Sequence, residues 1–330
     1  MYKIYVTEQQ KNDATTHYIE IIRKSLVQRN EDVCVINNIN DINNNDIVVV
    51  IEAKTHIRVL LKNPKQKVIC WYQGILPEEI NLQRTRNDKY LRMAFWYLME
   101  CLSLRFSHFC LFVSEEMRKH FERKYRLQIR NYYVMPCFNQ PLLKESFFVT
   151  GKYNSPTFVY AGSMHKWQCI DKMLEIFKSI KKEIPAASLT IYTSEQKLAR
   201  EYIEKHSVKN VKIDYLPYKE LNIALQNYKY GFLIRDNIEV NSVATPTKMN
   251  TYLANGIIPI YNNSMTAFRE NLRNIKHQII VDGNGKFIDK LKELENSNVI
   301  PEDIYSEYKN ELFSKFYSDE FHISQLSRLL

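Results

Sequence analysis

Short apolar runs rich in β-branched and aromatic residues alternate with longer amphipathic stretches along most of the chain. Runs of this kind predict β-strands, and in the first half they cover residues 3–6, 47–51, 68–72, 110–114 and 132–135. In the second half they cover residues 157–160, 188–192, 211–214, 231–234, 257–261 and 278–281. The stretches between them have apolar residues at helical spacing and predict helices, among them 15–29, 88–106, 115–125, 169–183, 195–206 and 247–255.

This alternation predicts an α/β fold in which helices wrap parallel sheets. The pattern restarts near residue 157, after a cluster of turn-forming residues that comprises Pro136, Pro141, Gly151 and Pro156. Since 330 residues also favour two domains, we expect two doubly wound, Rossmann-like domains with a boundary near residue 150. Ligands of such sheets bind beyond the carboxyl ends of the strands, so the expected site is a central cleft that the two domains face.

Glycine is scarce, which limits the kinds of phosphate-binding site and catalytic motif that the chain can form. Hydrophobic residues make up 45% and charged residues 25% of the chain, as in ordinary folded proteins. Only 7 residues are glycine, where a usage of roughly 7% predicts about 23. The sequence has no P-loop, GxGxxG, HExxH or GxSxG motif, which argues against P-loop, zincin and serine-hydrolase chemistry. A phosphate site must then be built from helix N-termini, hydroxyls and cations.

Cysteine usage and hydropathy indicate the cellular compartment of the protein. The six cysteines are scattered without a CxxC pair, which favours reduced thiols in a cytoplasmic protein. The most apolar run, residues 93–113, contains Glu100, Arg105 and His108 and therefore does not predict a membrane-spanning helix. No DxD pair follows a predicted strand, so a metal-dependent transferase of that type is disfavoured and no metal site is expected.

The net charge of +9 favours anionic partners. Residues 81–130 hold 11 basic and 5 acidic residues, and in region 84–105 cations are interleaved with aromatic rings. The cations are Arg84, Arg86, Lys89, Arg92 and Arg105, and the rings are Phe95, Trp96 and Tyr97. Such a face can bind an anionic membrane surface or nucleic acid. It is equally compatible with an ordinary helix whose charged face is exposed to water. No recognised nucleic-acid-binding module accompanies it.

Residues 231–261 carry the most informative chemistry. A buried strand is predicted to end at Arg235, and Thr245-Pro246-Thr247-Lys248 opens a short helix. Thr245 suits the N-cap and Pro246 the first helical position. The helix start and the charges of Arg235 and Lys248 together make an anion site without glycine, for which a diphosphate is the natural ligand. The alternative is an ordinary capped helix with a surface lysine.

A second candidate is the segment Phe158–Gln168, where a strand ends in Ala161-Gly162-Ser163. The small residues allow a group to approach the backbone, and Lys166 and Trp167 add a cation and an aromatic face. The alternative is a tight turn followed by a tryptophan that packs in the core.

In the first half, a Gly-x-x-Pro turn follows the strand at residues 68–72. Adjacent carboxylates at Glu78 and Glu79, with Gln73 before the turn, suit the hydroxyls of an acceptor or a catalytic base. They equally suit the first turn of a helix, where acids are favoured. His17, after Thr16, stands where the first strand–helix loop should end, although a lone histidine is more often a surface residue of a helix.

Five segments, in the same order along the chain, resemble the group 1 (family 4-like) glycosyltransferases, which have the two-domain GT-B fold. They are WYQGILPEE (71–79), FVSEEMRKHFERKY (112–125), VMPCFN (134–139), FVYAGSMHKWQ (158–168) and ATPTKMNTYLANGIIPI (244–260). The likeness is closer to the bacterial transferases that build capsular, exopolysaccharide or O-antigen repeat units. Each segment alone is weak evidence, but the five in order span most of the chain.

The resemblance implies an acceptor-binding domain over residues 1–150, a donor-binding domain over 151–310, and a C-terminal helix, 311–330, that packs back towards the first domain. It implies a UDP- or GDP-sugar as co-substrate, no other cofactor, and Arg235, Lys248 and Lys166 as catalytic cations at its diphosphate. The matching donor-binding positions are Gly162, Ser163, Trp167, Tyr218 (near the nucleobase), Asn241, Thr245, Thr247 and Thr251. The acceptor-binding candidates are Thr16, His17, Gln73, Glu78 and Glu79.

One departure from the family pattern concerns two glutamates separated by seven residues, which in the family contact the ribose and the donor sugar. Here the first position falls near Val243 and the second on Thr251. A Thr-Pro-Thr-Lys turn followed by a threonine resembles a variant of the subgroup, so the resemblance does not imply that activity is lost.

The implied reaction is metal-independent glycosyl transfer with retention of configuration to a saccharide, lipid-linked in the synthesis of surface polysaccharide. Cations stabilise the charge on the leaving diphosphate, whose oxygen takes the acceptor proton. We expect a cytoplasmic protein that meets the inner face of the plasma membrane through region 84–105 and does not bind nucleic acid. Two alternatives stay open: a GT-B-like binding or regulatory subunit without catalysis, which the absent glutamates favour, and a basic nucleic-acid-binding protein, which only the charge favours.

Overall fold

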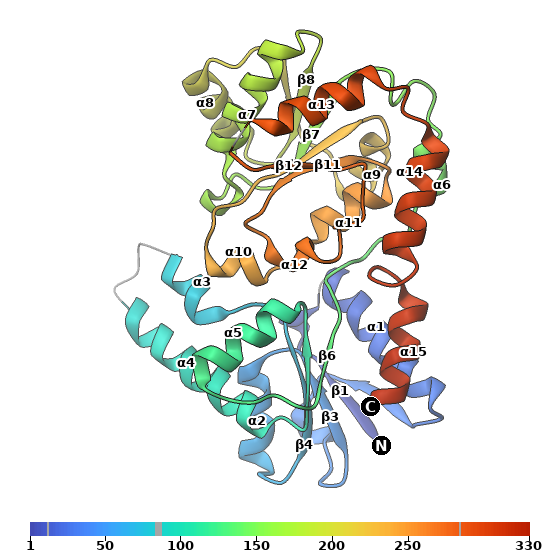
Figure 1. Cartoon of the computed structure of the whole chain (residues 1–330). Helices are drawn as coiled ribbons and strands as arrows, with labels where there is room; N and C mark the ends of the chain where they lie inside the picture. Colours follow the sequence, from blue (N-terminus) through green and yellow to red (C-terminus); the bar gives the residue numbers. More distant parts are fainter. Residues whose placement is uncertain (12, 83–87, 284) are drawn as a thin grey trace. The chain divides into compact units, whose positions relative to one another are not determined.

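Each of two structural units is built on a six-stranded parallel sheet (Figure 1). The computed structural model describes residues 1–11, 13–82, 88–283 and 285–330. Unit 1 comprises Met1–Asn139, Ser242–Thr245 and Lys315–Leu330, and unit 2 comprises Gln140–Asn241 and Pro246–Ser314, within those described ranges. The predicted α/β class with two doubly wound sheets is confirmed.

The sheet of unit 1 has the strand order β2-β1-β3-β4-β5-β6, with all neighbours parallel. The strands are β1 (Tyr2–Tyr5), β2 (Val33–Ile36), β3 (Ile47–Val50), β4 (Lys67–Tyr72), β5 (Phe109–Phe112) and β6 (Tyr132–Val134). Strand β4 is buried from Val68 to Tyr72, as expected for a parallel sheet covered on both faces. The chain steps from β1 to β2 on one side and then to β3 on the other, so the switch point of this sheet lies between β1 and β3.

Helices cover both faces of this sheet, because right-handed connections that run in opposite directions along a sheet lie on opposite faces. They are α1 (Asp13–Gln28), α2 (Ala53–Lys62), α3 (Leu76–Leu82), α4 (Lys89–Phe106), α5 (Glu115–Tyr125) and α15 (Asp319–Leu329). Short 3-10 turns, η1 (Glu8–Gln10) and η2 (Ile39–Asp41), lie in the loops. Helix α1 buries Tyr18, Ile22 and Leu26, which stand four residues apart on one face.

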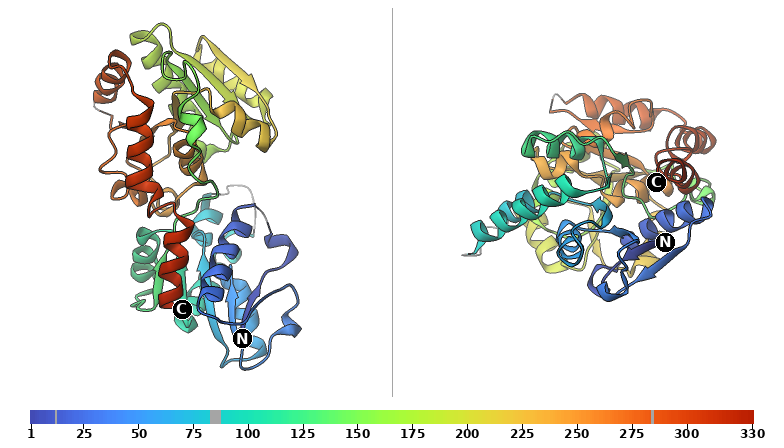
Figure 2. Two further views of the ribbon diagram at one scale, coloured as in Figure 1. Left: turned by 90° about the vertical axis from the view of Figure 1, so that its right-hand side faces the viewer. Right: turned by 90° about the horizontal axis from the view of Figure 1, so that it is seen from below.

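Residues 315–330 belong to unit 1, where α15 packs beside α1 (Figure 2). The ring of His17 contacts the Asp319 carboxylate, with Nε2 and Oδ1 3.1 Å apart, at the start of α15. The side chain of Ser318 caps this helix by accepting a hydrogen bond from the Phe321 N–H at 3.2 Å. The C-terminal stretch 301–330 is therefore divided between the two units.

The sheet of unit 2 has the order β12-β11-β10-β7-β8-β9, again with all neighbours parallel. The strands are β7 (Thr157–Ala161), β8 (Ser188–Tyr192), β9 (Val211–Asp214), β10 (Tyr230–Leu233), β11 (Ile258–Asn262) and β12 (Ile279–Val281). The chain moves from β7 to β8 and β9 on one side and then to β10 on the other. The switch point therefore lies between β7 and β10.

The helices of unit 2 alternate with these strands. They are α6 (Lys144–Phe147), α7 (Ile170–Glu183), α8 (Gln196–His206), α9 (Tyr218–Leu225), α11 (Thr247–Ala254), α12 (Thr266–Arg269), α13 (Lys286–Asn296) and α14 (Pro301–Tyr308), with a 3-10 turn η3 (Lys166–Gln168) and a π-helical turn η4 (Lys309–Phe313). Helix α10 (Glu239–Val243) stands where the chain enters residues 242–245 of unit 1. In α7, Ile170, Met173, Leu174 and Phe177 form the buried face at helical spacing.

Region 84–105 is described only in part, since Arg84 and Arg86 lie outside the described residues. Over the described part, α4 exposes large apolar side chains, with Tyr90 and Leu91 each 77% and Leu98 52% exposed. None of the helices in the described ranges combines the length and hydrophobicity that crossing a bilayer requires.

Candidate functional site

Two cations and one amide meet at the switch point of the unit 2 sheet. Arg235 follows β10, Gln168 ends η3 after β7, and Lys248 lies in the first turn of α11. The Oε1 atom of Gln168 accepts hydrogen bonds from Arg235 Nη1 at 2.5 Å and from Lys248 Nζ at 3.3 Å. The sequence predicted Arg235 and Lys248 for an anion site, and the fold brings them onto one neutral acceptor.

Both cations are confined, Arg235 being buried and Lys248 half-buried. Arg235 is 6% exposed, and the Lys248 ammonium lies 3.9 Å from the ring centroid of Tyr160, which is itself buried. Within the described part of the chain, neither Arg235 nor Lys248 forms an ion pair with a carboxylate. Buried charges are normally paired, so this arrangement indicates a site for an anion.

The pKa values of both groups reflect this confinement. Burial lowers the pKa of the Lys248 ammonium well below its ordinary value, and the charge of Arg235 lowers it further. Burial also lowers the pKa of the Arg235 guanidinium. A bound anion reverses both effects, because it stabilises the charged form of each side chain.

Neighbouring elements hold these groups in place. Asn262 at the end of β11 accepts a hydrogen bond from the Arg235 N–H at 3.1 Å and donates one to its carbonyl at 2.7 Å. Four residues after Lys248, and thus on the same face of α11, the hydroxyl of Tyr252 accepts a hydrogen bond from the Ala161 N–H at 3.3 Å. The position of Lys248 is therefore tied to the end of β7.

Gly162, directly after β7, leaves room for the lysine. A Cβ atom at this position would lie 2.8 Å from Lys248 Nζ and 3.2 Å from the Tyr160 hydroxyl. The backbone φ of +153° is also one that residues with a Cβ rarely adopt. The predicted need for a small residue here thus has a steric basis.

The prediction that Thr245 caps α11 is wrong. The helix begins at Thr247 after Pro246, and no side chain caps it. The Thr245 hydroxyl belongs to unit 1, where it accepts a hydrogen bond from the Cys137 N–H at 3.0 Å and donates one to the Val113 carbonyl at 3.4 Å. A buried hydroxyl bonds whichever partners the fold brings within reach, and here they come from other loops.

The other residues predicted around the diphosphate lie on the turn that contains η3. Lys166 and Trp167 are exposed, and the Trp167 ring stacks on His165 with centroids 4.5 Å apart. A hydrogen bond from Lys172 and, more weakly, the charge of Lys166 lower the pKa of Asp236. Ser163 accepts a hydrogen bond from the Tyr160 hydroxyl through its carbonyl, at 2.7 Å.

Three further donor-binding candidates lie on α9, α10 and α11. Tyr218 begins α9, and its hydroxyl accepts a hydrogen bond from Gln140 Nε2 at 2.9 Å. Asn241 is buried and donates to the Asp236 carbonyl at 2.9 Å, which shapes the loop after Arg235. Thr251 donates its hydroxyl back to the Thr247 carbonyl at 3.1 Å, one turn earlier in α11.

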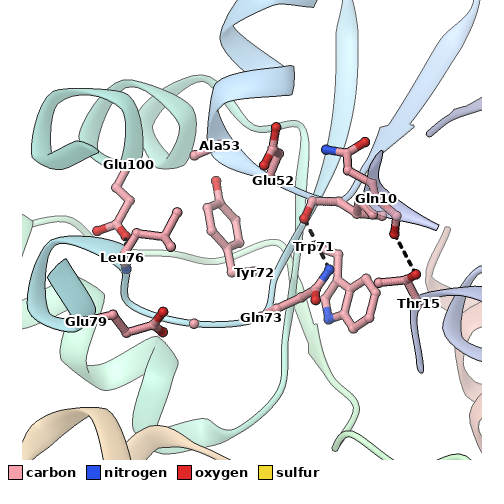
Figure 3. A pocket seen from close by; sticks show the side chains of 12 residues that line it. Gln10, Thr15, Glu52, Ala53, Trp71, Tyr72, Gln73, Leu76, Glu79 and Glu100 are labelled. Atoms are coloured by element: carbon pink, nitrogen blue, oxygen red, sulfur yellow. Dashed lines mark hydrogen bonds between the residues drawn. The ribbon is translucent and has the colours of Figure 1, made fainter. Parts of the chain in front are cut away.

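Unit 1 contains a cavity of about 310 Å³ at the switch point of its own sheet (Figure 3). Its walls come from the segments that follow β1, β3 and β4, so it lies beyond the carboxyl ends of the strands. Among the predicted acceptor-binding residues, Gln73 and Glu79 line it. Gln10, Thr15, Glu52, Trp71 and Glu100 line it as well.

Glu79 and the turn before it shape one side of this cavity. The Ile75 N–H donates to Glu79 Oε1 at 3.2 Å, and a Cβ atom on Gly74 would lie 2.2 Å from the same oxygen. Gly74 is therefore needed for this carboxylate to reach its position. Burial raises the pKa of Glu79, and the charge of Glu78 adds to the effect, although the hydrogen bond from Ile75 opposes it.

The remaining acceptor-binding candidates lie elsewhere in unit 1. Glu78 faces away from the cavity towards α5, where its Oε1 lies 2.9 Å from Lys124 Nζ and 3.4 Å from His120 Nε2. Burial alone would raise the pKa of Glu78, but these contacts lower it. His17 contacts Asp319, and Thr16 beside it is exposed.

Sequence reasoning missed several residues of the two sites. Gln168 ends the segment 158–168 and Asn262 lies outside the five segments, but both are uncharged and received no role, so only the fold shows that they hold Arg235. Glu100 appeared only as an interruption of an apolar run, yet it is 1% exposed and accepts a hydrogen bond from the Leu76 N–H at 2.9 Å. The one sequence signal for Glu100 was an acidic residue within an apolar helical run.

No protein-family model matches this sequence, and no curated protein matches it either. Solved structures do match. Sucrose-phosphate synthase from Thermosynechococcus elongatus has a TM-score of 0.69 and 9% identity, over 99% of this chain and 97% of its own. A point mutant of S. aureus TarM, in complex with fondaparinux, alpha-GlcNAc-glycerol and UDP, has a TM-score of 0.60 and 13% identity, over 86% of this chain and 55% of its own. The trehalose-6-phosphate synthase OtsA has a TM-score of 0.60 and 11% identity, over 98% of this chain and 80% of its own.

These similarities confirm the GT-B fold that the sequence resemblance predicted. The chain spans only about half the length of TarM.

Proposed function

We propose that this protein is a glycosyltransferase that binds a nucleotide sugar on unit 2 and transfers its sugar to a saccharide. The observation that carries the proposal is a pair of cations, buried Arg235 and half-buried Lys248, which share Gln168 at the switch point of the unit 2 sheet and pair with no carboxylate of the described residues. A nucleoside diphosphate supplies the negative charge that this pair lacks. The presence of UDP in the TarM structure, which has the same fold, supports this choice of ligand.

In the proposed reaction the two cations stabilise the charge that develops on the diphosphate as the bond to the sugar breaks. Because the enclosed site excludes part of the water, each contact to the phosphates is stronger than at the protein surface. We propose that these side chains supply the charge compensation without a metal ion. We further propose that the sugar keeps its anomeric configuration, with a phosphate oxygen taking the acceptor proton.

We propose a lipid-linked saccharide of bacterial surface polysaccharide synthesis as the acceptor, and attachment to anionic membrane at the cytoplasmic face. Helix α4 supports the attachment, because exposed Tyr90 and Leu91 stand beside Lys89 and Arg92. Flotation with anionic and zwitterionic vesicles tests this, with Leu91→Glu expected to abolish binding to anionic vesicles. The control is Ile223→Glu, which changes an exposed apolar residue of unit 2 and should leave binding intact.

A panel of UDP-, GDP- and CMP-sugars tests the nucleotide site through the melting temperature of the protein, since a ligand of the folded state stabilises it. We expect one nucleotide class to raise the melting temperature of the wild type and of Lys197→Met, an exposed control lysine on α8. Lys248→Met and Arg235→Met should lose the shift. The proposal fails if no nucleotide sugar stabilises the wild type.

A catalytically inactive GT-B subunit is the second candidate, because Thr251 stands where the resembling family has a glutamate, and among the described residues its hydroxyl donates to the carbonyl of Thr247 in its own helix. The two candidates differ in turnover. Acceptor-dependent release of the nucleotide in the presence of EDTA excludes the inactive subunit, whereas nucleotide binding without release with any saccharide tested favours it. NMR of the product then reports whether the configuration is retained.

A further inference from the structure

The cavity of unit 1 has the opposite electrostatic character to the anion site of unit 2. Carboxylates from three helices border it: Glu52 at the start of α2, Glu79 in α3 and Glu100 in α4. No lysine or arginine lines it in the described part of the chain. A carboxylate or phosphate that entered would meet like charges, which costs free energy that a hydroxyl or an amine does not.

The carboxylates differ in how much hydrogen-bonding capacity they have left. Glu100 is fully engaged, because Leu76 occupies Oε1 while Tyr125 and Lys124 occupy Oε2 at 2.7 and 3.1 Å. Glu79 has only Oε1 engaged, by the Ile75 N–H, and Glu52 has only Oε1 engaged, by the Thr55 hydroxyl at 2.7 Å. Among contacts between described residues, one oxygen of Glu52 and one of Glu79 thus stay available to a ligand that donates hydrogen bonds.

Aromatic and amide groups complete the wall of the cavity. Trp71 at the end of β4 is 1% exposed and stacks on Tyr18 with ring centroids 3.6 Å apart. Gln73 donates from its amide to the Ile51 carbonyl at 3.3 Å, and no described residue bonds its oxygen, which stays available to a ligand (Figure 3).

Acceptor oxygens from Glu52, Glu79 and Gln73 match the hydroxyl groups of a sugar, which donate hydrogen bonds. The volume of about 310 Å³ suits a single ring rather than a longer saccharide. We propose that this cavity binds the terminal sugar of the acceptor, that this sugar carries only hydroxyl, amide or amino groups, and that sugars with a carboxylate or phosphate are rejected. Its identification as the acceptor rests on the proposed function.

Titration of the full chain with methyl glycosides of a hexose, a hexosamine and a hexuronic acid, followed by ligand-observed NMR, tests the proposal. We expect the hexose and the hexosamine to bind and the hexuronic acid to bind at least about 10-fold more weakly. In the double variant Glu52→Gln, Glu79→Gln this discrimination should largely disappear. Each glutamine keeps an oxygen for the partner that its glutamate has now, and Glu52→Gln alone serves if the double variant does not fold.

Glu116→Gln is the control, since it removes a carboxylate of unit 1 that contacts Lys119 in α5 instead of lining the cavity. This variant should discriminate as the wild type does. Equal binding of hexose and hexuronic acid to the wild type, no binding of any glycoside, or unchanged discrimination in the double variant overturns the proposal. The nucleotide-induced melting shift, measured on the same samples, reports on the proposed function separately, because it depends on unit 2.

Discussion

Replacing Gln168 by glutamate should stabilise the protein and weaken nucleotide binding at the same time. The new carboxylate would stand where the amide oxygen now lies, 2.5 Å from Arg235 Nη1 and 3.3 Å from Lys248 Nζ. At an effective dielectric constant of about 20, two unit charges about 3 Å apart attract by about 5 kcal/mol. Desolvation of the carboxylate offsets several kcal/mol of this attraction, which leaves a net gain of about 2 kcal/mol.

Two measurements follow from this estimate. The melting temperature should rise by about 4–8 °C, since 1 kcal/mol shifts it by about 2–4 °C in a unit of this size. Titration calorimetry with the nucleotide that stabilises the wild type should show an affinity at least about 100-fold lower, because the diphosphate now has to displace an internal anion from the same two cations.

Gln168→Ala separates charge from packing. It removes the shared acceptor but adds no charge, so it should lower the melting temperature while changing nucleotide affinity far less than glutamate does. If Gln168→Glu lowers the melting temperature and binds nucleotide as the wild type does, Arg235 and Lys248 are not an uncompensated pair and the electrostatic argument is refuted.

Nucleotide affinity should fall as pH rises through the lowered pKa of Lys248, because the diphosphate binds the charged form of this side chain; in that pH range binding takes up a proton, which calorimetry in buffers of different ionisation enthalpy measures and Lys248→Met should abolish. Gly162→Ala should displace Lys248 and thereby weaken nucleotide binding by about 10-fold. The control is Gly151→Ala, at a position with a left-handed backbone and open space around it, which should lower the free energy of unfolding by about 1 kcal/mol and leave nucleotide binding unchanged. Burial lowers the pKa of His56 and of His322 to about 4, below the value of about 6.5 in an unfolded chain. Between these two pKa values the unfolded state therefore binds more protons, and the free energy of unfolding should fall with falling pH by up to about 3 kcal/mol for each histidine. Urea titrations at several pH values measure this fall. An unchanged pH dependence in His322→Asn would contradict the reasoning.

Local patterns predicted the strands of both sheets except β2. Residues Val33–Ile36 form the edge of the unit 1 sheet, and Cys34 and Val35 are exposed there. The apolar run of β2, VCVI, is shorter than that of a central strand such as β4, and so short a run is weaker evidence for a strand. The expected C-terminal helix, 311–330, begins only at Asp319, because the chain turns at residues 314–317, before the capping hydroxyl of Ser318, and a resemblance does not register so short a break.

The residues of the candidate sites also differ in whether the sequence alone could predict them. Arg235 and Lys248 could be predicted, since a charge at the end of a strand and one in the first turn of a helix are local features. Gln168 could not, because its partners lie 67 and 80 residues away in the sequence. Glu78 and Glu79 show the limit of spacing arguments: the two are adjacent, but consecutive residues of a helix point in different directions, so one lines the cavity and the other contacts Lys124.

The division of unit 1 among separate stretches of sequence has a consequence for biosynthesis. His17 and Asp319 stand 302 residues apart, so α1 leaves the ribosome long before α15, which packs beside it. The face of α1 that α15 covers stays open while the whole of unit 2 is translated, and contacts of such long range form slowly. Nascent chains of this protein should therefore depend on chaperones until translation has passed residue 319.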